Sequence, residues 1–375
     1  MEIPQTRQII QQGLESGLHI GAQLYVSLHG QPVVDASFGL SRLGGEADAS
    51  LAGTPMQPDT LMIWLSAGKP LTAVAIALLA QRGRLHFDDP VAHYIPEFAQ
   101  NGKDAITIRH LLTHTAGIRA LDTQYPFLTW DETLAKLFTL KPERDWIPGE
   151  KAGYHAHSTW YILGELIHRI DGRPCDQFLR EEIFLHLAMT DTFLSMPTET
   201  YHAYGSRIGF LHDTAPATAE PPKPLPNYDT PLAASRPRPS GSVRGPIRQL
   251  GLFYEMMLRA LADKNEILTP DTARLLVARQ RTGMFDVTFR HKIDWGLGFI
   301  LNSSHHGPAI PYQFGPHASP TTFGHGGSQC AVGMADPFHQ LVIALIFNGC
   351  PGEPAHDRRL RATLKALYED LALAR

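Results

Sequence analysis

Hydrophobic residues near the start of the chain change from a helical spacing to a strand spacing. Apolar residues first recur three or four positions apart, at Ile9, Ile10, Leu14 and Leu18. Two apolar runs follow at 22–28 (AQLYVSL) and 32–38 (PVVDASF), separated by the polar turn 29–31. Short apolar runs on either side of a glycine-containing turn are typical of a β-hairpin. The chain is therefore expected to begin with a helix that is followed by two strands.

The C-terminal part of the chain shows the same two spacings in the opposite order. Three apolar runs are expected to be strands: 294–301 (DWGLGFIL), 329–336 (QCAVGMAD) and 340–348 (QLVIALIFN). Leucines at helical spacing follow, at Leu360, Leu364, Leu367 and Leu371. We expect the strands from both ends to share one antiparallel sheet, flanked by the N- and C-terminal helices.

Between these ends the apolar residues mostly follow the helical period. The expected helices are 66–81, 108–112, 130–138, 158–169 and 175–185. The whole pattern predicts an α/β protein of the α+β type, in which a mostly helical subdomain interrupts a sheet subdomain. We place the sheet subdomain at 1–65 and 241–375 and the helical subdomain at 66–240.

One segment of the helical subdomain lacks this regularity. Eight prolines lie within 216–239, and few apolar residues there are periodic. Such a composition disfavours both a helix and a central strand. We expect a long ordered loop or flap, which either connects the subdomains or shapes a substrate site.

Composition favours a small-molecule ligand. The 375 residues are 43% hydrophobic and 19% charged, which is enough apolar material for a large core. The net charge is −4, and no dense run of lysine and arginine is present. A basic surface for nucleic acid or for an anionic membrane is therefore not expected.

The cysteines and the N-terminal residues indicate the cellular location of the protein. Cys175, Cys330 and Cys350 are widely spaced and contain no C-x-x-C pair, so neither a disulfide framework nor a zinc site is indicated, and buried or inert thiols are expected. The first residues lack a basic start followed by an apolar core and a small-residue cleavage site. We expect a cytoplasmic protein.

Lys69 is the first candidate for chemistry, because it lies in the otherwise uncharged apolar run 61–80. Ser66 precedes it by three positions, which places both side chains on one helix face. A serine hydroxyl needs a neighbouring base, and a lysine serves as that base only when burial or nearby cations lower its pKa. Lowering a lysine pKa from about 10.4 to about 7 or 8 takes roughly 4 kcal/mol. A buried apolar helix would supply much of this.

Two other interpretations of the same run stay open. The run is about as long as the roughly 20 residues that cross a bilayer, although a central lysine costs about 2.5 to 3.5 kcal/mol there and Pro70 is adjacent. An exposed lysine at the end of an ordinary core helix is the second interpretation. The S-x-x-K motif alone does not decide among the three.

Tyr154 is the second candidate. It follows the Pro148-Gly149 turn and precedes the apolar helix that begins near Ser158, so its side chain can point into a cleft. A phenol can relay protons if a cation such as Lys69 lowers its pKa from about 10. A packing role for the aromatic ring is the alternative.

The third candidate is the run Gly324-His325-Gly326-Gly327-Ser328, which precedes the strand expected at 330–336. Glycines allow a substrate to approach a strand edge, and exposed backbone N–H groups there can stabilise an oxyanion. A tight turn that enters a strand is the alternative. The α/β-hydrolase fold is disfavoured, because the chain contains no G-x-S-x-G motif.

The order and separation of the three candidates resemble the β-lactamase-related serine hydrolases, which include class C β-lactamases, D-alanyl-D-alanine carboxypeptidases and family VIII carboxylesterases. Further stretches resemble recurrent segments of that superfamily in their usual order: LHFDDPVAHYIPEF, ITIRHLLTHTAGI, WYILGELIHRIDGRP, WGLGFIL and FGHGGSQCAVGMADP. The resemblance spans roughly residues 5–370, the Pro-rich segment excepted, and implies the β-lactamase/transpeptidase-like fold.

The resemblance also implies roles for residues at matching positions. Ser66 would be the acylated nucleophile, Lys69 its activating partner and Tyr154 the proton relay. His325 takes the place of the lysine in the K-T-G motif of β-lactamases, followed by Gly326 and Gly327. The family's oxyanion hole would comprise the backbone N–H groups of Ser66 and Ser328.

Two departures from the family pattern bear on the substrate. The usual Y-x-N motif is Tyr154-His155-Ala156 here, without the amide that helps to position the substrate. His325 replaces a fixed cation by a group that titrates near pH 6.5, which weakens recognition of a substrate carboxylate at that place. Both departures favour neutral esters over penicillins.

The expected function is hydrolysis of a small carboxylic ester through acyl-Ser66, with a small-molecule ester or amide as the substrate. A β-lactamase, a D-amino-acid peptidase or amidase, and an acyltransferase would use the same intermediate. A ligand-binding scaffold of the same fold is the non-enzymatic alternative, and the intact Ser66, Lys69 and Tyr154 argue against it.

Histidines and glycines give no sign of a metal or a cofactor. His110 and His114 lie four apart without an H-E-x-x-H motif and are expected to be structural, and His305 and His306 lie in a polar turn. His157 and its neighbour His155 flank Ala156 and are expected on the surface, with compensation for the missing amide as the alternative. No glycine pattern for phosphate or dinucleotide binding follows a strand.

Overall fold

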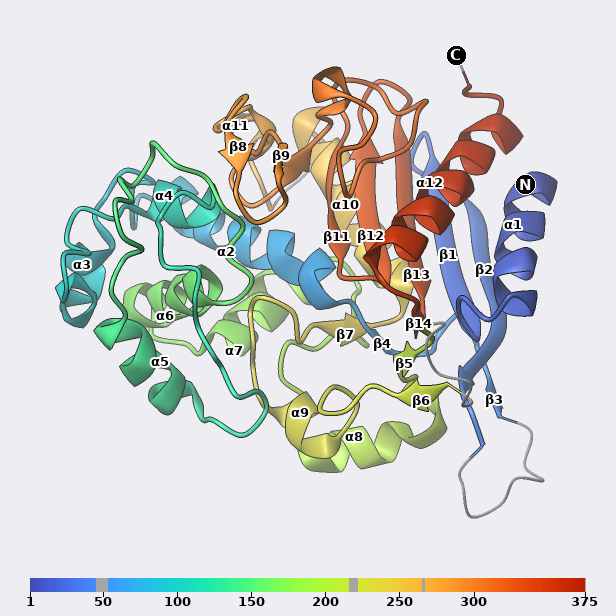
Figure 1. Ribbon diagram of the computed structural model, residues 1–375, viewed down its shortest axis with the longest axis horizontal. Helices are drawn as coiled ribbons and strands as arrows, with labels where there is room; N and C mark the ends of the chain where they lie inside the picture. Colours follow the sequence, from blue (N-terminus) through green and yellow to red (C-terminus); the bar gives the residue numbers. More distant parts are fainter. Residues whose placement is uncertain (45–52, 216–221, 265–266, 375) are drawn as a thin grey trace.

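Strands from both ends of the chain form one antiparallel sheet. The computed structural model describes residues 1–44, 53–215, 222–264 and 267–374. Within them the largest sheet has seven strands in the order β10-β11-β12-β13-β1-β2-β3, and all its neighbours are antiparallel (Figure 1). Its strands are β1 (Gly21–Leu28), β2 (Gln31–Arg42), β3 (Thr54–Pro55), β10 (Ile300–Leu301), β11 (Phe323–Gly327), β12 (Ala331–Asp336) and β13 (Leu341–Phe347). The expected antiparallel sheet is confirmed.

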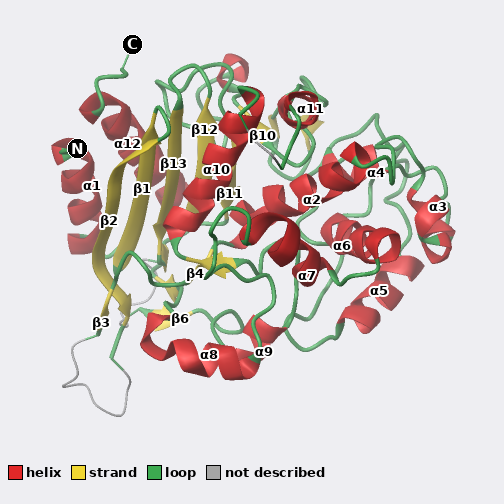
Figure 2. Cartoon of the chain, turned by 180° about the vertical axis from the view of Figure 1, so that it is seen from behind, coloured by secondary structure: helices red, strands yellow, loops and turns green. Residues whose placement is uncertain are grey.

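Helices cover both faces of this sheet. The helices α1 (Pro4–Glu15) and α12 (Glu353–Asp370) pack on one face, and α10 (Ile247–Leu261) packs on the other (Figure 2). Along β13, Val342, Ala344 and Ile346 contribute to the core on the α10 side, whereas the residues between them belong to the core under α1 and α12. Since side chains alternate along a strand, both faces of β13 are buried, which explains its unbroken apolar sequence.

The prediction of a strand at 294–301 is wrong for most of these residues. Only Ile300–Leu301 forms the strand β10, and the preceding residues form a tight loop. The Gly296 N–H donates to the Phe299 carbonyl at 2.9 Å, and Gly298 has a φ of +79°. A left-handed glycine reverses the chain at this point, so the apolar run cannot continue as a strand.

Helices dominate the region between the two halves of the sheet (Figure 1). They are α2 (Lys69–Gln81), α3 (Val91–Tyr94), α4 (Ile108–Leu112), α5 (Trp130–Thr139), α6 (Ser158–Asp171), α7 (Cys175–Leu179), α8 (Thr198–Tyr204) and α9 (Pro231–Ser235); α11 (Pro270–Val277) follows α10. The helix expected at 175–185 changes to a wider π turn at Arg180–Phe184. The three cysteines are free and buried, as expected.

Short strands join this region to the sheet. β4 (Met62–Ile63) pairs with β7 (Arg244–Gly245), and β8 (Phe285–Asp286) pairs with β9 (His291–Lys292). A three-stranded sheet is formed by β14 (Gly349–Cys350), β5 (His212–Asp213) and β6 (Lys223–Pro224). The β4–β7 pair matters most for the site, because β4 leads directly to Ser66.

The Pro-rich segment is only partly described. Residues 216–221 lie outside the described residues, and the expectation of a loop or flap at those positions stays a prediction. The remainder contains the helix α9, so the expectation that proline disfavours a helix is wrong there. Pro231 occupies the first turn, and the Thr230 Oγ1 accepts a hydrogen bond from the Ala233 N–H at 3.1 Å. Proline is tolerated at the first helical position because that N–H has no partner in the helix.

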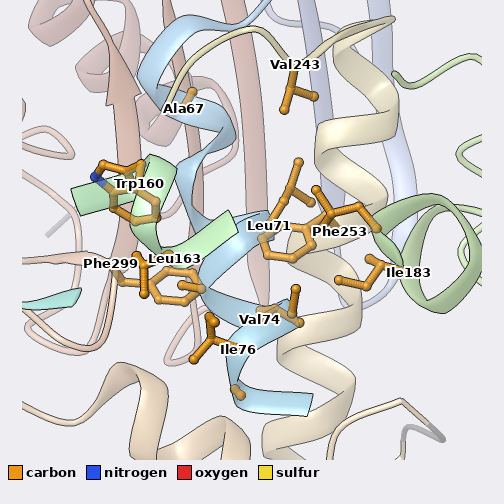
Figure 3. Close-up of a cluster of buried hydrophobic side chains, with 14 of the residues drawn as sticks. Ala67, Leu71, Val74, Ile76, Trp160, Leu163, Ile183, Val243, Phe253 and Phe299 are labelled. Atoms are coloured by element: carbon orange, nitrogen blue, oxygen red, sulfur yellow. The ribbon is translucent and has the colours of Figure 1, made fainter. Parts of the chain in front are cut away.

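The helix α2 is buried along nearly its whole length. Every residue from 69 to 79 is buried, and the helix has close neighbours in α6, α7 and α11. Side chains of this core are drawn in Figure 3. Leu71 and Val74 of α2 lie near Phe253 of α10, and Trp160 of α6 lies on the other side. A helix that is apolar all round belongs in a core. Among the described residues, no helix has the length and apolarity needed to span a bilayer.

Candidate active site

Ser66 lies in one turn of 3₁₀ helix, Leu65–Gly68, that leads into α2. Leu65 has a φ of +48°, in the left-handed region that residues with a side chain rarely adopt. The turn therefore holds backbone strain directly before the serine, as functional sites often do. Lys69 begins α2, and its Nζ donates a hydrogen bond to the Ser66 Oγ at 2.9 Å. The two side chains meet as expected, across a 3₁₀ turn in place of an α-helical one.

Lys69 is fully buried and has no compensating anion. Its side chain is 0% exposed, and its Nζ makes a second hydrogen bond, to the Ser240 carbonyl at 2.7 Å. In the described part of the chain no carboxylate lies within 4 Å of this nitrogen. Burial, and secondly the positive charge of Arg238, hold the pKa of Lys69 well below its ordinary value. A neutral amine beside a serine hydroxyl can accept its proton.

The β4–β7 pair brings Ser240 beside Ser66. Met62 pairs with Gly245, and the Trp64 N–H donates to the Val243 carbonyl at 2.8 Å. The segment 240–245 therefore runs alongside the segment that leads to the nucleophile. The two paired strands lie about 180 residues apart in the chain. Their pairing places the Ser240 carbonyl, the second acceptor of Lys69, beside its Nζ.

Tyr154 lies on the loop before α6, against Lys69. Its ring centroid is 5.2 Å from the Lys69 Nζ and 6.1 Å from the ring of His325. Its backbone N–H donates to Asp286 Oδ1 at 3.0 Å, which fixes the loop. Burial raises the pKa of Tyr154, and the hydrogen bond with Ser66 acts in the opposite direction. The condition that a cation such as Lys69 lowers this pKa is not met, so the phenol is neutral and can donate its proton.

The glycines of this run lie in a strand, β11, and Ser328 begins the turn that follows it. A Cβ on Gly327 would lie 2.3 Å from the Trp64 carbonyl oxygen, and one on Gly326 would lie 2.4 Å from the ring of Tyr312. Side chains at these two positions would collide with their neighbours. The glycines therefore allow β11 to pass directly beside the segment that carries Ser66.

His325 of β11 is a neutral group. It is 2% exposed, and its Nδ1 lies 2.7 Å from the Gly326 carbonyl oxygen. Burial, together with the charge of Lys69, lowers the pKa of His325 to about 3. The expectation of a group that titrates near pH 6.5 is wrong, mainly because burial disfavours a charged imidazole at this place.

The other histidines divide into structural and cavity-lining residues. His155, expected on the surface, is 0% exposed, and its Nε2 accepts a hydrogen bond from the Ile118 N–H at 3.0 Å. Its backbone N–H donates to His114 Nδ1 at 3.0 Å, and the Thr107 N–H donates to His110 Nδ1 at 3.2 Å. These contacts are structural. His157 is only partly exposed and lines the cavity described next, so surface exposure is wrong for it as well.

A cavity of about 310 Å³ joins the candidates. Its lining includes Ser66, Tyr154, His325, Gly326 and Ser328 from the candidates identified in the sequence. Gly327 does not line the cavity, and Lys69 lies buried behind Ser66. The volume suits a small substrate.

Several lining residues were missed by the sequence analysis. They are Leu65, Tyr228, Arg238, Ser240, Gly241, Phe289, Ile300, Tyr312 and Glu353. Three of them belong to the end of the Pro-rich segment and the residues directly after it. The available signal was an arginine between two prolines, just before the Ser240-Gly241 pair.

One group among the described residues has the composition of a metal site. Ligand atoms of Asp294, His305 and His306 lie within 4.8 Å of one another. Asp294 Oδ2, however, pairs with Arg279 at 2.6 Å, and Oδ1 accepts from the Gly283 N–H at 2.8 Å. Since a guanidinium already occupies this carboxylate, hydrogen bonding accounts for the group. These residues do not line the cavity.

Comparisons with known proteins agree on one family. A family model described as Beta-lactamase matches residues 6–368. Esterase/beta-lactamase LipL of Mycobacterium tuberculosis is 33% identical over 171 residues, which cover 44% of this chain but only 36% of LipL. A putative D-alanyl-D-alanine carboxypeptidase of Escherichia coli K12 is 25% identical over 324 residues, or 76% of this chain and 68% of that protein. The crystal structure of a family VIII carboxylesterase superimposes with a TM-score of 0.76 at 25% identity, covering 98% of this chain and 97% of that one.

Proposed function

The chain belongs to the Beta-lactamase family of serine hydrolases, and from this premise we propose that it cleaves small carboxylic esters through an acyl intermediate on Ser66. The observation that carries the proposal is the 2.9 Å contact between the Ser66 Oγ and the Nζ of a buried lysine. Because the described residues place no carboxylate beside this lysine, a neutral amine is favoured there. A neutral amine at that distance is a base for the serine.

In the first step Lys69 accepts the Ser66 proton while the Oγ attacks the carbonyl carbon of the ester. The carbonyl oxygen becomes an oxyanion, which the backbone N–H groups of Ser66 and Ser328 would stabilise. When the intermediate collapses, the C–O bond to the alcohol breaks and the alcohol leaves with a proton from Tyr154, which regains one from Lys69. Water then attacks the acyl-Ser66 carbonyl and gives a proton to Lys69. The bond between the acyl carbon and the Ser66 Oγ breaks, the Oγ takes that proton back from Lys69, and the acid is released.

Two features of the cavity favour esters. Ala156 offers no amide where related hydrolases position an amide substrate, and His325 is neutral where β-lactamases carry a cation. An alcohol is also a better leaving group than an amine, so an ester needs less protonation in the transition state. The name of LipL, which joins esterase and beta-lactamase, makes β-lactam cleavage the alternative to test.

Active-site labelling tests the proposal most directly. We expect a fluorophosphonate to add one adduct to the folded protein, seen by intact mass, and no adduct in Ser66→Ala. A folded wild type that stays unlabelled would instead favour a ligand-binding scaffold. Among labelled preparations, short-chain nitrophenyl esters should be hydrolysed faster than a chromogenic cephalosporin. Faster turnover of the cephalosporin would show that the ester preference is wrong.

A further inference from the structure

Arg238 is a buried cation in the wall of the candidate active site. Its side chain lines the same cavity as Ser66, yet the residue is only 4% exposed. It lies near enough to Lys69 and His157 for its charge to lower the pKa of both. No role for this residue follows from the proposed mechanism.

The guanidinium of Arg238 is held in place but hardly hydrogen-bonded. It stacks 4.0 Å from the ring centroid of Tyr125 and 5.6 Å from that of Tyr228. Among the described residues it makes one hydrogen bond, from Nη2 to the Gly241 carbonyl, which is long at 3.4 Å, and its Nε has no partner there. The Arg238 backbone is fixed by hydrogen bonds with Ser242, one of them from the Arg238 N–H to the Ser242 Oγ at 2.8 Å.

Other buried arginines among the described residues have a nearby carboxylate or several carbonyl acceptors, although each also has a nitrogen without a partner. Arg281 pairs with Asp286 at 3.0 Å, and Arg244 lies 3.8 Å from Asp229. Arg359 donates to three backbone carbonyls instead. For Arg238, by contrast, the described residues offer no carboxylate within 4 Å. An uncompensated buried charge costs several kcal/mol, so a fold keeps one only where something compensates it.

Glu353, the carboxylate that lines the same cavity, does not neutralise Arg238. Its oxygens accept hydrogen bonds from the Tyr312 hydroxyl at 2.7 and 2.8 Å and from the Ser328 hydroxyl at 3.0 Å. The cavity therefore presents an unpaired guanidinium, with the Ser240 and His157 side chains in contact with each other in the same lining. A planar guanidinium with free N–H groups matches a carboxylate.

We propose that Arg238 binds a carboxylate of the substrate, so that the preferred esters carry a second, ionised carboxyl group, as monoesters of small dicarboxylic acids do. This inference rests on the proposed ester hydrolysis for its reaction but not for its binding step. It places the anion at Arg238, away from His325. Neutral esters remain substrates, without this contact.

Binding is tested first, on a background without chemistry. In Ser66→Ala we expect monomethyl glutarate to bind by calorimetry, and methyl valerate, its equivalent without the carboxylate, to bind far more weakly. Adding Arg238→Met should weaken monomethyl glutarate binding by roughly 30- to 100-fold, the value of a charged hydrogen-bonded pair. Adding Arg236→Met is the matched control, because Arg236 lies two residues away and does not line the cavity, and it should leave the affinity unchanged.

Turnover then separates recognition from a general effect on Lys69. We expect the ratio of kcat/KM for monomethyl glutarate over methyl valerate to fall roughly 30- to 100-fold in Arg238→Met and to be partly kept in Arg238→Lys. Any change in the pKa of Lys69 affects both esters and cancels in the ratio. An equal loss for both esters, with unchanged binding in the Ser66→Ala background, would overturn the proposal and leave Arg238 an electrostatic neighbour of Lys69.

The two proposals fail differently. Arg238-dependent binding of monomethyl glutarate without hydrolysis of any ester would contradict the ester hydrolase and keep the carboxylate site. Hydrolysis of methyl valerate with no preference for monomethyl glutarate would contradict the carboxylate site and keep the ester hydrolase. Arg238→Lys, which keeps the charge, also serves where Arg238→Met does not fold.

Discussion

Two lysines of this protein are equally buried but have different hydrogen-bond partners. Lys69 and Lys103 are both 0% exposed. The Nζ of Lys103 donates to three backbone carbonyls, those of Gln100 at 2.6 Å, Phe138 at 3.0 Å and Leu140 at 2.6 Å. The Nζ of Lys69 has one carbonyl acceptor, and its other partner is the Ser66 hydroxyl.

The difference shows that the partners of a buried lysine, and not its burial, indicate its role. Three carbonyls use all three N–H groups of an ammonium, and none of them can give it a proton. Lys103 thus joins the end of α5 to a neighbouring loop, at the helix terminus that favours a positive charge. Burial lowers the pKa of both lysines, but only Lys69 also lies near another cation, Arg238. Lys69 also contacts the Ser66 hydroxyl, the group whose proton a general base would accept.

The largest expected effect separates these two roles by activity. Lys69→Ala should lower the rate of acylation by about 10⁴-fold, since general base catalysis contributes up to that amount. Lys103→Met should leave kcat/KM per folded molecule unchanged, because Lys103 does not line the cavity. The measurement is pre-steady-state release of nitrophenol, with circular dichroism to establish folding. Near-normal acylation in folded Lys69→Ala would remove the lysine from the mechanism.

A smaller loss is expected at the neighbouring phenol. Tyr154→Phe removes the proton donor but keeps the ring that contacts Lys69, so acylation should fall about 10²- to 10³-fold. Tyr161→Phe is a suitable control, since this buried tyrosine of α6 does not line the cavity. Esters with increasingly acidic leaving groups should be less affected, because they need less protonation. A uniform loss across the leaving groups would contradict the role of Tyr154 as the donor.

The sequence predicted the parts of this site that depend on local structure. Ser66 and Lys69 are three residues apart in one apolar run, and helical geometry alone brings them together. Tyr154 and the run that contains His325 were candidates from local pattern, and the order of motifs that resembles a family favoured them over their structural alternatives. Their meeting depends on the packing of β11 against the turn that carries Ser66.

The remaining residues depend on contacts that no local pattern reports. Arg238 and Ser240 reach the cavity because β7 pairs with β4, and proline density made their segment look like a connector. Lys103 lies in the polar run Asn101-Gly102-Lys103-Asp104, which is typical of a surface turn. Two of its three acceptors lie about 35 residues further along the chain. In both cases burial is decided by a distant segment.

A further expected effect concerns stability, and here the two lysine substitutions should change the free energy of unfolding in opposite directions. Lys69→Met replaces an amine that is buried away from water. The free energy of unfolding of this variant at pH 7 should therefore exceed that of the wild type. Lys103→Met leaves three carbonyls without their donor and should destabilise the fold, by about 1 to 3 kcal/mol for each carbonyl that stays buried.

The pH dependence of unfolding tests independently whether Lys69 lowers the stability of the fold at pH 7. Its pKa in the folded protein lies below the ordinary value of 10.5, so between these two values the unfolded chain binds one more proton. The stability that Lys69 contributes therefore rises with pH through this window, by about 1.4 kcal/mol per unit, and is constant above it. Urea unfolding from pH 7 to 10 should show the advantage of Lys69→Met shrinking as the pH rises. A gap that widens with pH would mean that Lys69 is stabilised as an ammonium, and would make it a second structural lysine like Lys103.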